Sequence, residues 1–191
     1  MTVTLGALTV MWVAFPVSEI VLAVVKRARG VARATVKDRG SLALLWTAIA
    51  AGVVAGNVVR WTTPGAMRAP AAAYETAGLA LLLCGLALRW TAILSLGRLF
   101  TTDVAVHADH RVVRSGVYRH LRHPAYSGLL VAFLGLGVSF GHWLSLAVVM
   151  APLVPALAYR IRVEERALTE SLGSEYEEYS RVTKRLIPGI Y

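Results

Sequence analysis

Residues 126–159 read YSGLLVAFLGLGVSFGHWLSLAVVMAPLVPALAY, an apolar run of 34 residues that contains no Asp, Glu, Lys or Arg. A helix crosses the roughly 30 Å hydrocarbon core of a bilayer with about 20 apolar residues, so this run exceeds one span. The sequence SFGHW at residues 139–143 interrupts the run. Gly, His and Trp together are typical of a turn at the membrane interface. The run therefore predicts a hairpin of two short transmembrane helices.

Three more apolar stretches precede the hairpin, at residues 3–25, 42–59 and 72–96. Each is long enough to cross a bilayer as a helix. The first lacks the basic start and small-residue cleavage site of a secretory signal, so we predict that it is a retained span. Hydrophobic residues make up 57 % of the chain and charged residues 16 %, against roughly 45–50 % and 25 % in soluble domains. The predicted fold is an all-α integral membrane protein with about five transmembrane helices.

The basic residues lie mainly in the connections between these spans. Residues 26–39 hold six Lys and Arg, residues 98–122 hold five and residues 160–185 hold six, but residues 60–68 hold two and residues 139–143 none. Because cytoplasmic connections carry the excess of Lys and Arg, the alternation predicts an outer N-terminus and a cytoplasmic C-terminus. It also explains the net charge of +9, which therefore does not indicate a nucleic-acid partner. Such basic segments favour membrane lipids with anionic headgroups.

The chain is predicted to form a single membrane domain, residues 1–191, with four parts. Residues 1–96 hold three spans, residues 97–125 form a cytoplasmic loop, residues 126–159 form the hairpin, and residues 160–191 form cytoplasmic helices. The loop and the C-terminal part are the connections large enough to carry chemistry. Since both are predicted on the cytoplasmic side, they can meet in a site that is half exposed to water and half to lipid.

The loop before the hairpin contains the sequence HADHRVVRSGVYRHLRHPAYSG at residues 107–128. Four of the five histidines lie in it, namely His107, His110, His120 and His123. A metal site is not predicted, because no HExxH pair and no Cys or Asp completes a ligand set. The residue before a proline avoids the helical region, so His123 and Pro124 predict a corner. There Arg122 can bind an anion and Tyr126 can stack or hydrogen-bond. The alternative is a basic and aromatic belt at the interface.

The C-terminal part begins with a helix by pattern, and Gly173 is its predicted stop. Arg160 and Glu164 are four residues apart and share a face of this helix, whereas Glu165 lies about 100° further round. Charges at the mouth of a span are costly if they face lipid, which favours a buried polar site. The alternative is an ordinary surface ion pair between Arg160 and Glu164.

The sequence after Gly173 predicts a second, short helix. Tyr176 and Tyr179 are expected to pack it onto its neighbour. Three acidic residues are expected to be solvated, namely Glu175, Glu177 and Glu178.

Within the predicted spans, Glu19 and Arg89 are charged residues and hence candidate functional residues. We expect them to make an interhelical or interfacial polar contact. Small residues let membrane helices approach closely. The sequence predicts this role for Gly52 and Gly56, and for Gly137 and Gly141.

Two blocks of the sequence resemble the isoprenylcysteine carboxyl methyltransferase family and its prokaryotic relatives. The first block is GVYRHLRHPAYSG at residues 116–128, with the pattern G-x-Y-x-x-x-R-H-P-x-Y-x-G. The second is RIRVEERALTESLGSEYEEYSRVTKRLIP at residues 160–188, with the paired acids Glu164 and Glu165. Both stand in the family's order and are separated by an apolar hairpin.

The resemblance implies a membrane enzyme that uses S-adenosylmethionine and releases S-adenosylhomocysteine. It implies catalytic roles for Arg160 and Glu164, in which Arg160 orients the acceptor and Glu164 binds the amino end of the cofactor. The implied cofactor contacts are His110, Arg111, Val112, Val113, Tyr118, His123, Pro124, Ala125, Tyr126, Glu164 and Glu165. Asp103 departs from the family, in which eukaryotic members tend to have Gln. The implied location is the prokaryotic cytoplasmic membrane, with the active site on the cytoplasmic side.

The function implied is methyl transfer to a lipophilic or prenylated acceptor, and Arg160 favours a carboxylate. Such transfer is an in-line displacement that needs alignment more than acid or base groups. One alternative is a phospholipid N-methyltransferase. Another is a membrane reductase of the sterol-reductase type that uses NADPH, although the paired acids disfavour a phosphorylated nicotinamide. A third is a membrane scaffold that binds neither cofactor.

Overall fold

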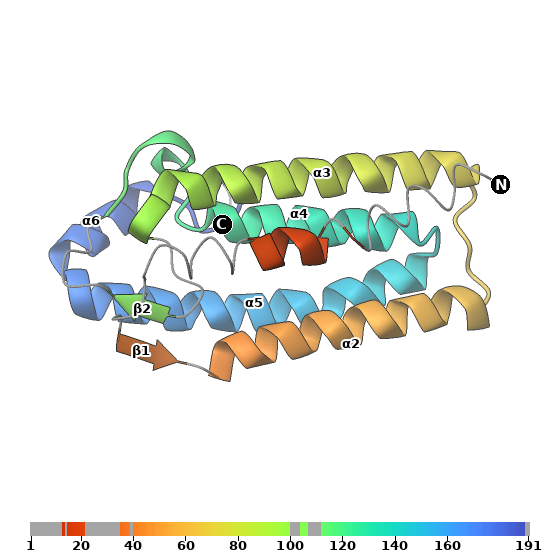
Figure 1. The fold of residues 1–191 in the computed structure, drawn as a ribbon, viewed down its shortest axis with the longest axis horizontal. Coiled ribbons are helices and arrows are strands. Elements are labelled where there is room, and N and C mark those ends of the chain that lie inside the picture. The colour runs from red at the N-terminus through yellow and green to blue at the C-terminus, as the bar shows by residue number, and fades with distance from the viewer. Residues whose placement is uncertain are drawn as a thin grey trace.

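The computed structural model describes residues 13, 15–21, 35–38, 40–99, 104–106 and 112–189. Most of these residues are helical (Figure 1). The α-helices are α2 (Gly40–Thr62), α3 (Ala71–Leu96), α4 (Pro124–Ser139), α5 (Trp143–Leu172) and α6 (Ser174–Val182). Short 3₁₀ turns form η1 (Gly97–Leu99) and η2 (Gly116–Arg119), the strands are β1 (Thr35–Asp38) and β2 (Val104–Val106), and residues 15–21 are also helical.

Three helices of the described part, α2, α3 and α5, are long and apolar enough to cross a membrane. Helix α4 is apolar but shorter, with 16 residues. The predicted spans at residues 42–59 and 72–96 therefore correspond to α2 and α3. Most of the predicted span at residues 3–25 lies outside the described residues. A helical membrane protein is confirmed, and the number of spans and their orientation stay predictions.

The predicted hairpin has its turn where the sequence SFGHW stands. Helix α4 ends at Ser139 and α5 begins at Trp143. Gly141 lies between them with φ +63°, a backbone conformation that glycine adopts without steric cost. The turn at residues 139–143 is therefore confirmed.

One small sheet interrupts the helical fold. Strands β1 and β2 pair antiparallel, with Thr35 opposite Val106 and Val36 opposite Ala105. Sequence analysis predicted no strands here, because the two segments are short and far apart in the chain. The sheet joins two of the basic connections.

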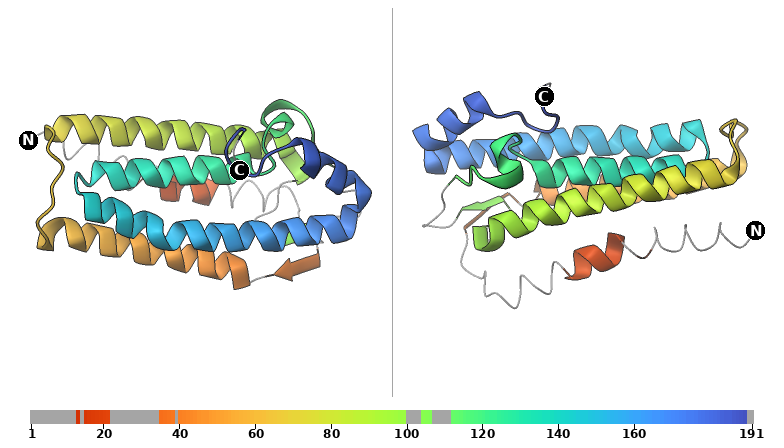
Figure 2. Two further views of the ribbon diagram at one scale, coloured as in Figure 1. Left: turned by 180° about the vertical axis from the view of Figure 1, so that it is seen from behind. Right: turned by 90° about the horizontal axis from the view of Figure 1, so that it is seen from above.

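The two helices of the hairpin, α4 and α5, pack mainly on earlier helices and less on each other. Helix α3 lies along α4, and α2 lies along α5, as two antiparallel pairs (Figures 1 and 2). Each arm of the hairpin thus packs more extensively on an earlier helix than on the other arm. The loop before α4, η2 and α6 gather at one end of the bundle, and the α2–α3 connection and the α4–α5 turn lie at the other.

Glycines bring α3 and α4 into backbone contact. A Cβ atom added to Gly135 would lie 2.5 Å from the carbonyl oxygen of Gly78, and one on Gly128 equally close to the carbonyl oxygen of Gly85. Both pairs are seven residues apart on their helices, so the contact repeats after two turns. Close backbone approach through small residues is a common way to associate membrane helices. These four glycines were missed by sequence analysis.

The predicted close approaches at Gly52 and Gly56 are confirmed between α2 and α5. A Cβ atom on Gly56 would lie 2.8 Å from Cγ2 of Val149, and one on Gly52 would lie 3.1 Å from Cγ of Pro152. Gly137 likewise faces Leu146 across the hairpin, with 2.6 Å between such an added Cβ and Cδ1.

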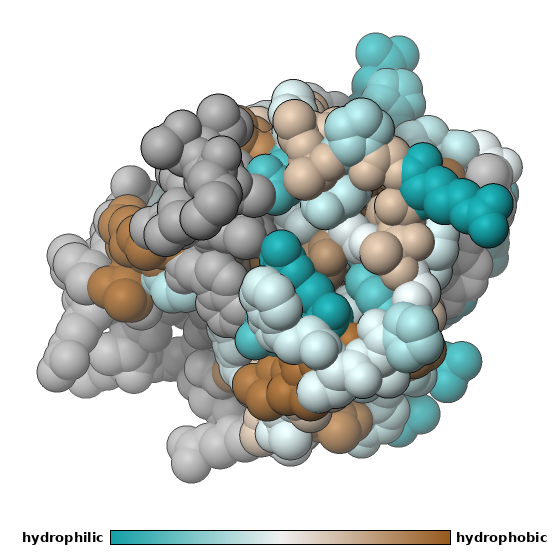
Figure 3. Space-filling model, turned by 90° about the vertical axis from the view of Figure 1, so that its right-hand side faces the viewer, coloured by the Kyte–Doolittle hydropathy of each residue, from teal (hydrophilic) through white to brown (hydrophobic). Residues whose placement is uncertain are grey.

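Figure 3 shows the end of the bundle that holds the α2–α3 connection and the hairpin turn. His142 links these two segments by hydrogen bonds. Its Nδ1 accepts a hydrogen bond from the Ser145 N–H (3.3 Å), so Nε2 donates to the carbonyl of Thr63 (3.2 Å). The surface at this end of the molecule mixes hydrophilic and hydrophobic residues (Figure 3). Residues 61–66 are exposed there. This end holds no part of the site described below.

Candidate functional site

The corner at His123 is formed as the sequence predicts. His123 has φ −126° and ψ 54°, outside the helical region, and Pro124 is the first residue of α4. A proline fits the first turn of a helix because its missing N–H would have no partner there. His123 is 4 % exposed. The corner therefore presents a buried imidazole at the start of α4.

The corner is held by the C-terminal segment, residues 183–188. The N–H groups of Arg122 and His123 donate to the carbonyls of Lys184 (2.7 Å) and Arg185 (3.1 Å). The Ser127 hydroxyl donates to the carbonyl of Leu186 (2.7 Å). Two blocks that are about 60 residues apart in the chain thus form one backbone unit.

Helix α6 packs on η2 through its tyrosines, as expected. Tyr176 and Tyr179 are 5 % and 4 % exposed. The Tyr179 hydroxyl donates to the carbonyls of Tyr118 (2.7 Å) and Leu121 (3.2 Å). Burial raises the pKa of Tyr179 to about 12, so the hydroxyl keeps its proton at neutral pH. Burial also raises the pKa of Tyr118.

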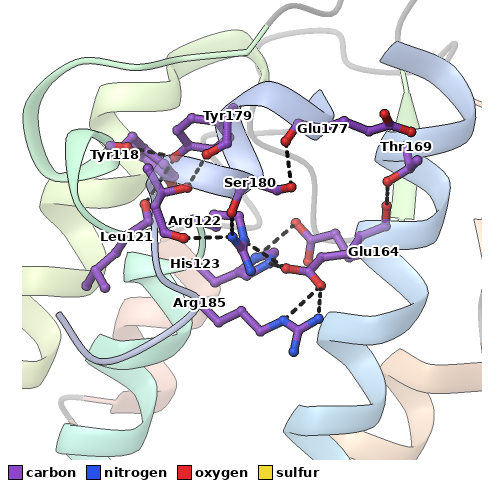
Figure 4. Close-up of polar contacts among 12 residues, drawn as sticks. Tyr118, Leu121, Arg122, His123, Glu164, Thr169, Glu177, Tyr179, Ser180 and Arg185 are labelled. Carbon is purple, nitrogen blue, oxygen red and sulfur yellow. Dashed lines mark hydrogen bonds and ion pairs between the residues drawn. The ribbon is translucent and has the colours of Figure 1, made fainter. Parts of the chain in front are cut away.

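Glu165 is bound by three cationic or basic side chains. These are Arg122, His123 and Arg185, which are labelled in Figure 4. Oε1 of Glu165 lies 2.9 Å from Nε of Arg122 and 3.3 Å from Nε2 of His123, and its Oε2 lies 2.7 Å from Nη2 of Arg185. Arg122 also donates to the carbonyls of Thr183 (2.8 Å) and Ser180 (2.5 Å). Glu165 therefore ties the corner and the C-terminal segment to α5.

Glu164 has a different environment. Its Oε2 accepts a hydrogen bond from the Tyr126 hydroxyl (2.7 Å), and its Oε1 lies 3.9 Å from Nδ1 of His123. The Tyr126 hydroxyl in turn accepts from Nε of Arg160 (3.3 Å). Nη1 of Arg160 donates to the Ser41 hydroxyl (2.7 Å). The result is a continuous chain of hydrogen bonds from α2 to Glu164.

Both predicted catalytic residues belong to this chain of hydrogen bonds, but only Arg160 is buried. Arg160 is 1 % exposed, and it shares its face of α5 with Glu164, as the four-residue spacing predicts. The surface ion pair that sequence analysis left open is therefore excluded for Arg160. Ser41 was missed, because a serine at the start of an apolar stretch carries no signal of such a contact.

A cavity of about 90 Å³ opens beside these groups. Six of the predicted site residues line it, namely Tyr118, His123, Ala125, Tyr126, Arg160 and Glu164. Arg89, Arg122 and Glu19 line it as well. This cavity thus lies where α5, the loop before α4 and parts of the first half of the chain meet. Its walls combine charged and polar side chains with apolar ones, and it is called the polar cavity below to distinguish it from its almost entirely apolar neighbour.

The other predicted site residues are placed differently. Val112, Val113, Pro124 and Glu165 do not line this cavity. The Val112 N–H donates to Oε1 of Glu175 (3.1 Å). The prediction that Glu175 is merely solvated is therefore wrong, since it holds the loop. His110, Arg111 and Asp103 lie outside the described residues.

A second cavity, of about 340 Å³, adjoins the first. It lies between residues 15–19, α2, α3 and α4, and its walls are almost entirely apolar. Glu19, Trp46 and Ile49 line both cavities. A molecule with a hydrocarbon chain and a polar head could therefore place one part in each cavity.

The polar contact expected for Glu19 and Arg89 is confirmed. Nε and Nη2 of Arg89 lie 2.9 Å and 3.1 Å from Oε1 and Oε2 of Glu19, a bidentate ion pair. Nη1 of Arg89 also donates to the carbonyl of Ala125 (3.4 Å). Across the described ranges, no cluster of three His, Cys, Asp or Glu side chains is placed to hold a metal ion.

Known methyltransferases are similar to this chain. The model of the isoprenylcysteine carboxyl methyltransferase (ICMT) family matches residues 78–170. The chain is 35 % identical over 115 residues to a probable protein-S-isoprenylcysteine O-methyltransferase of Oryza sativa subsp. indica, over 59 % of this chain and 60 % of the relative. It is 32 % identical over 117 residues to the protein-S-isoprenylcysteine O-methyltransferase of Schizosaccharomyces pombe, over 60 % of this chain and 50 % of the relative.

Among solved structures, the chain resembles the eukaryotic intramembrane Ras methyltransferase ICMT with a TM-score of 0.58 and 26 % identity. The match covers 75 % of this chain and 52 % of that chain. The aligned part thus spans between half and 60 % of the length of these relatives. The family model matches slightly less than half of this chain, and the matched residues 78–170 include the corner, the hairpin and both predicted catalytic residues. This part of the chain is similar to the isoprenylcysteine carboxyl methyltransferase family.

Proposed function

We propose that this protein is a membrane methyltransferase that uses S-adenosylmethionine and methylates a lipophilic acceptor at the membrane interface. The observation that carries the proposal is the junction of the two cavities. The polar one is lined by Arg160, Tyr126 and Glu164, and the apolar one adjoins it through shared walls. An enzyme that joins a polar cofactor to an apolar acceptor needs such a junction.

The residues of the polar cavity fit the cofactor chemically. Glu164 can pair with the cofactor's ammonium group. One of its carboxylate oxygens accepts a hydrogen bond from the Tyr126 hydroxyl, and its side chain is 30 % exposed and therefore accessible. Tyr118 and Tyr126 supply aromatic walls. When bound, S-adenosylmethionine supplies an electrophilic methyl group on a sulfonium. The remaining proposed contacts are His110, Arg111, Val112, Val113, His123, Pro124, Ala125 and Glu165.

Arg160 is proposed to orient the acceptor. A guanidinium holds a carboxylate in a defined direction, and the hydroxyls of Ser41 and Tyr126 fix the Arg160 side chain. Methyl transfer to a carboxylate neutralises opposite charges, so a cavity that excludes water favours the reaction. The acceptor is proposed to be a prenyl or other lipid carboxylate whose hydrocarbon chain lies in the apolar cavity.

We further propose five transmembrane helices, with the N-terminus outside and the cavity end of the bundle on the cytoplasmic side. The alternation of Lys and Arg between the connections supports this orientation. On this view the cofactor enters from the cytoplasm and the acceptor enters sideways from the bilayer.

A binding experiment tests the proposed function. Purified protein in nanodiscs is titrated calorimetrically with S-adenosylhomocysteine and, separately, with NADPH. We expect saturable binding of S-adenosylhomocysteine alone. Binding of NADPH alone would indicate a reductase, and binding of neither by folded protein would indicate a scaffold; either result overturns the proposal.

A further inference from the structure

The Glu19–Arg89 ion pair stands where the two cavities meet. Glu19 lines both cavities, and Arg89 lines the polar one. Glu19 is the only charged residue on the wall of the apolar cavity in the part of the chain that the structure describes. An acceptor whose chain lies in the apolar cavity and whose head reaches the polar one must therefore pass this pair.

The pair is buried and asymmetric. The side chains of Arg89 and Glu19 are 8 % and 14 % exposed. Arg89 is held on α3, and its Nη1 also contacts the carbonyl of Ala125 at the corner. Glu19 belongs to the helical segment of residues 15–21 and is the more exposed partner. An anion beside a buried guanidinium offsets its loss of hydration, but that anion need not come from the protein.

We propose that Glu19 pairs with Arg89 in the empty protein and that the acceptor's head group takes over this position on Arg89 when it binds. This inference rests on the proposed function, and it adds Arg89 as a second arginine for the acceptor. A carboxylate carried by an amphiphile exchanges with the Glu19 carboxylate as the head passes from the apolar to the polar cavity. The guanidinium keeps an anion throughout, so an acid can complete the exchange. A neutral head group cannot replace Glu19, because the replacement would leave Arg89 buried without a counter-charge. The ion pair thereby selects amphiphilic acids.

The proposal predicts that one substitution lowers the stability of the empty protein but raises its affinity for an amphiphilic acid. In Glu19→Gln the protein lacks the internal anion, so Arg89 is left unpaired and the empty protein loses stability. An amphiphilic acid then supplies the missing charge without having to displace Glu19. The acid should therefore bind the variant more tightly than it binds the wild type. A pair that only clamps the helices predicts the opposite, namely weaker binding in a loosened site.

The experiment uses lauric acid as the acid and lauramide as its neutral analogue, with full-length protein in phosphatidylcholine nanodiscs. Phosphatidylcholine is zwitterionic, so the bilayer offers no net negative charge to compete. The proteins compared are the wild type, Glu19→Gln, and the double variant Glu19→Gln/Arg89→Met. The double variant removes both charges, which is often close to neutral for stability. Thermal unfolding is followed over a range of ligand concentrations, and each ligand's affinity is taken from the concentration dependence of Tm.

We expect lauric acid to bind Glu19→Gln roughly tenfold or more tightly than the wild type, and lauramide to show no such gain. Arg160 is present in every variant, so each protein keeps some preference for the acid. The ratio of acid affinity to amide affinity should be highest in Glu19→Gln and lowest in the double variant. Equal gains for the amide in Glu19→Gln, or a ratio in the double variant as high as in Glu19→Gln, would overturn the proposal. If Glu19→Gln is not recovered folded, the wild type and the double variant still decide, because the ratio should be lower in the double variant.

Affinity for S-adenosylhomocysteine is measured on the same samples. Loss of cofactor binding in all of them would contradict the proposed methyltransferase function. Intact cofactor binding without the gain in acid affinity in Glu19→Gln would contradict only the role of Glu19 and Arg89.

Discussion

Glu164 and Glu165 are neighbours in the chain, yet they belong to two different regions of the molecule. Glu164 faces the polar cavity and accepts one hydrogen bond from the Tyr126 hydroxyl. Glu165 faces the C-terminal segment and is bound by Arg122, His123 and Arg185. The side of α5 that each carboxylate occupies decides its partners.

The different partners of Glu164 and Glu165 indicate that one carboxylate can bind a ligand and that the other supports the structure. A carboxylate that already has several close cationic partners gains little from another cation. Glu164 has one hydrogen bond from a hydroxyl and a more distant imidazole 3.9 Å away, so it can still bind an ammonium group. We therefore propose that Glu164 is the main cofactor-binding carboxylate of the two and that Glu165 supports the corner. Four substitutions test this division, and they are ordered here by the size of the expected effect.

Glu164→Gln should have the largest effect. It keeps the shape of the side chain but removes the charge that pairs with the ammonium group. Loss of one partner of such a pair costs about 2 kcal/mol or more, so affinity for S-adenosylhomocysteine should fall roughly 30-fold. Calorimetric titration measures the affinity, and Tm should change little. Unchanged affinity in folded protein would contradict the role of Glu164.

Glu165→Gln should act mainly on stability. Arg122 would keep a buried guanidinium without its anion, and we expect a loss of about 2 kcal/mol. Arg185 adds little to this loss, because its side chain is 34 % exposed. Denaturant unfolding measures the change, and limited proteolysis of residues 183–188 reports release of the segment. Glu178→Gln, the same change at an exposed position of α6, should have no effect. A stable Glu165→Gln variant that has lost cofactor affinity would reverse the division.

Tyr126→Phe should affect the cavity more mildly. It removes the donor to Glu164 and the acceptor for Arg160, but it keeps the aromatic ring. A hydrogen bond to a charged group is worth about 1.5 kcal/mol, so we expect roughly a tenfold loss of affinity for S-adenosylhomocysteine. Combined with Glu164→Gln, the loss should be smaller than the sum of the two, because both act on one contact. Full additivity would show that Tyr126 does not act through Glu164.

Tyr179→Phe should have the smallest effect. It leaves the carbonyls of Tyr118 and Leu121 without the tyrosine hydroxyl, which should lower the free energy of unfolding by about 1 kcal/mol. Chemical denaturation measures this loss. Cofactor affinity should stay within twofold of the wild type, by order of magnitude. A larger loss of affinity would mean that α6 itself shapes the cavity.

Several features of the site could be predicted from local sequence. The His123–Pro124 corner follows from the steric effect of proline on the residue before it. The shared face of Arg160 and Glu164 follows from helix geometry alone. An interhelical or interfacial polar contact was expected for Glu19 and for Arg89, because charges within spans need partners. In each case one local rule is strong enough to decide the outcome.

Other features could not be predicted, because they depend on which helices become neighbours. Ser41 contacts Arg160 only because α2 packs along α5. Glu165 and Glu164 look alike as a pair of acids, and only the position of the C-terminal segment distinguishes them. The glycines of α3 and α4 carry no mark that tells which glycine meets which.

The sequence by itself therefore determined the apolar helices, the turn at residues 139–143, the corner before α4 and the spacing of the charged residues on α5. These depend on hydropathy, backbone sterics and the helical repeat, which act over a few residues. Only the tertiary structure decided the pairing of α3 with α4 and of α2 with α5, the partners of each carboxylate, and the meeting of the two cavities at Glu19. Those depend on side-chain packing between segments far apart in the chain, where many pairings satisfy the same apolar pattern and shape complementarity selects one.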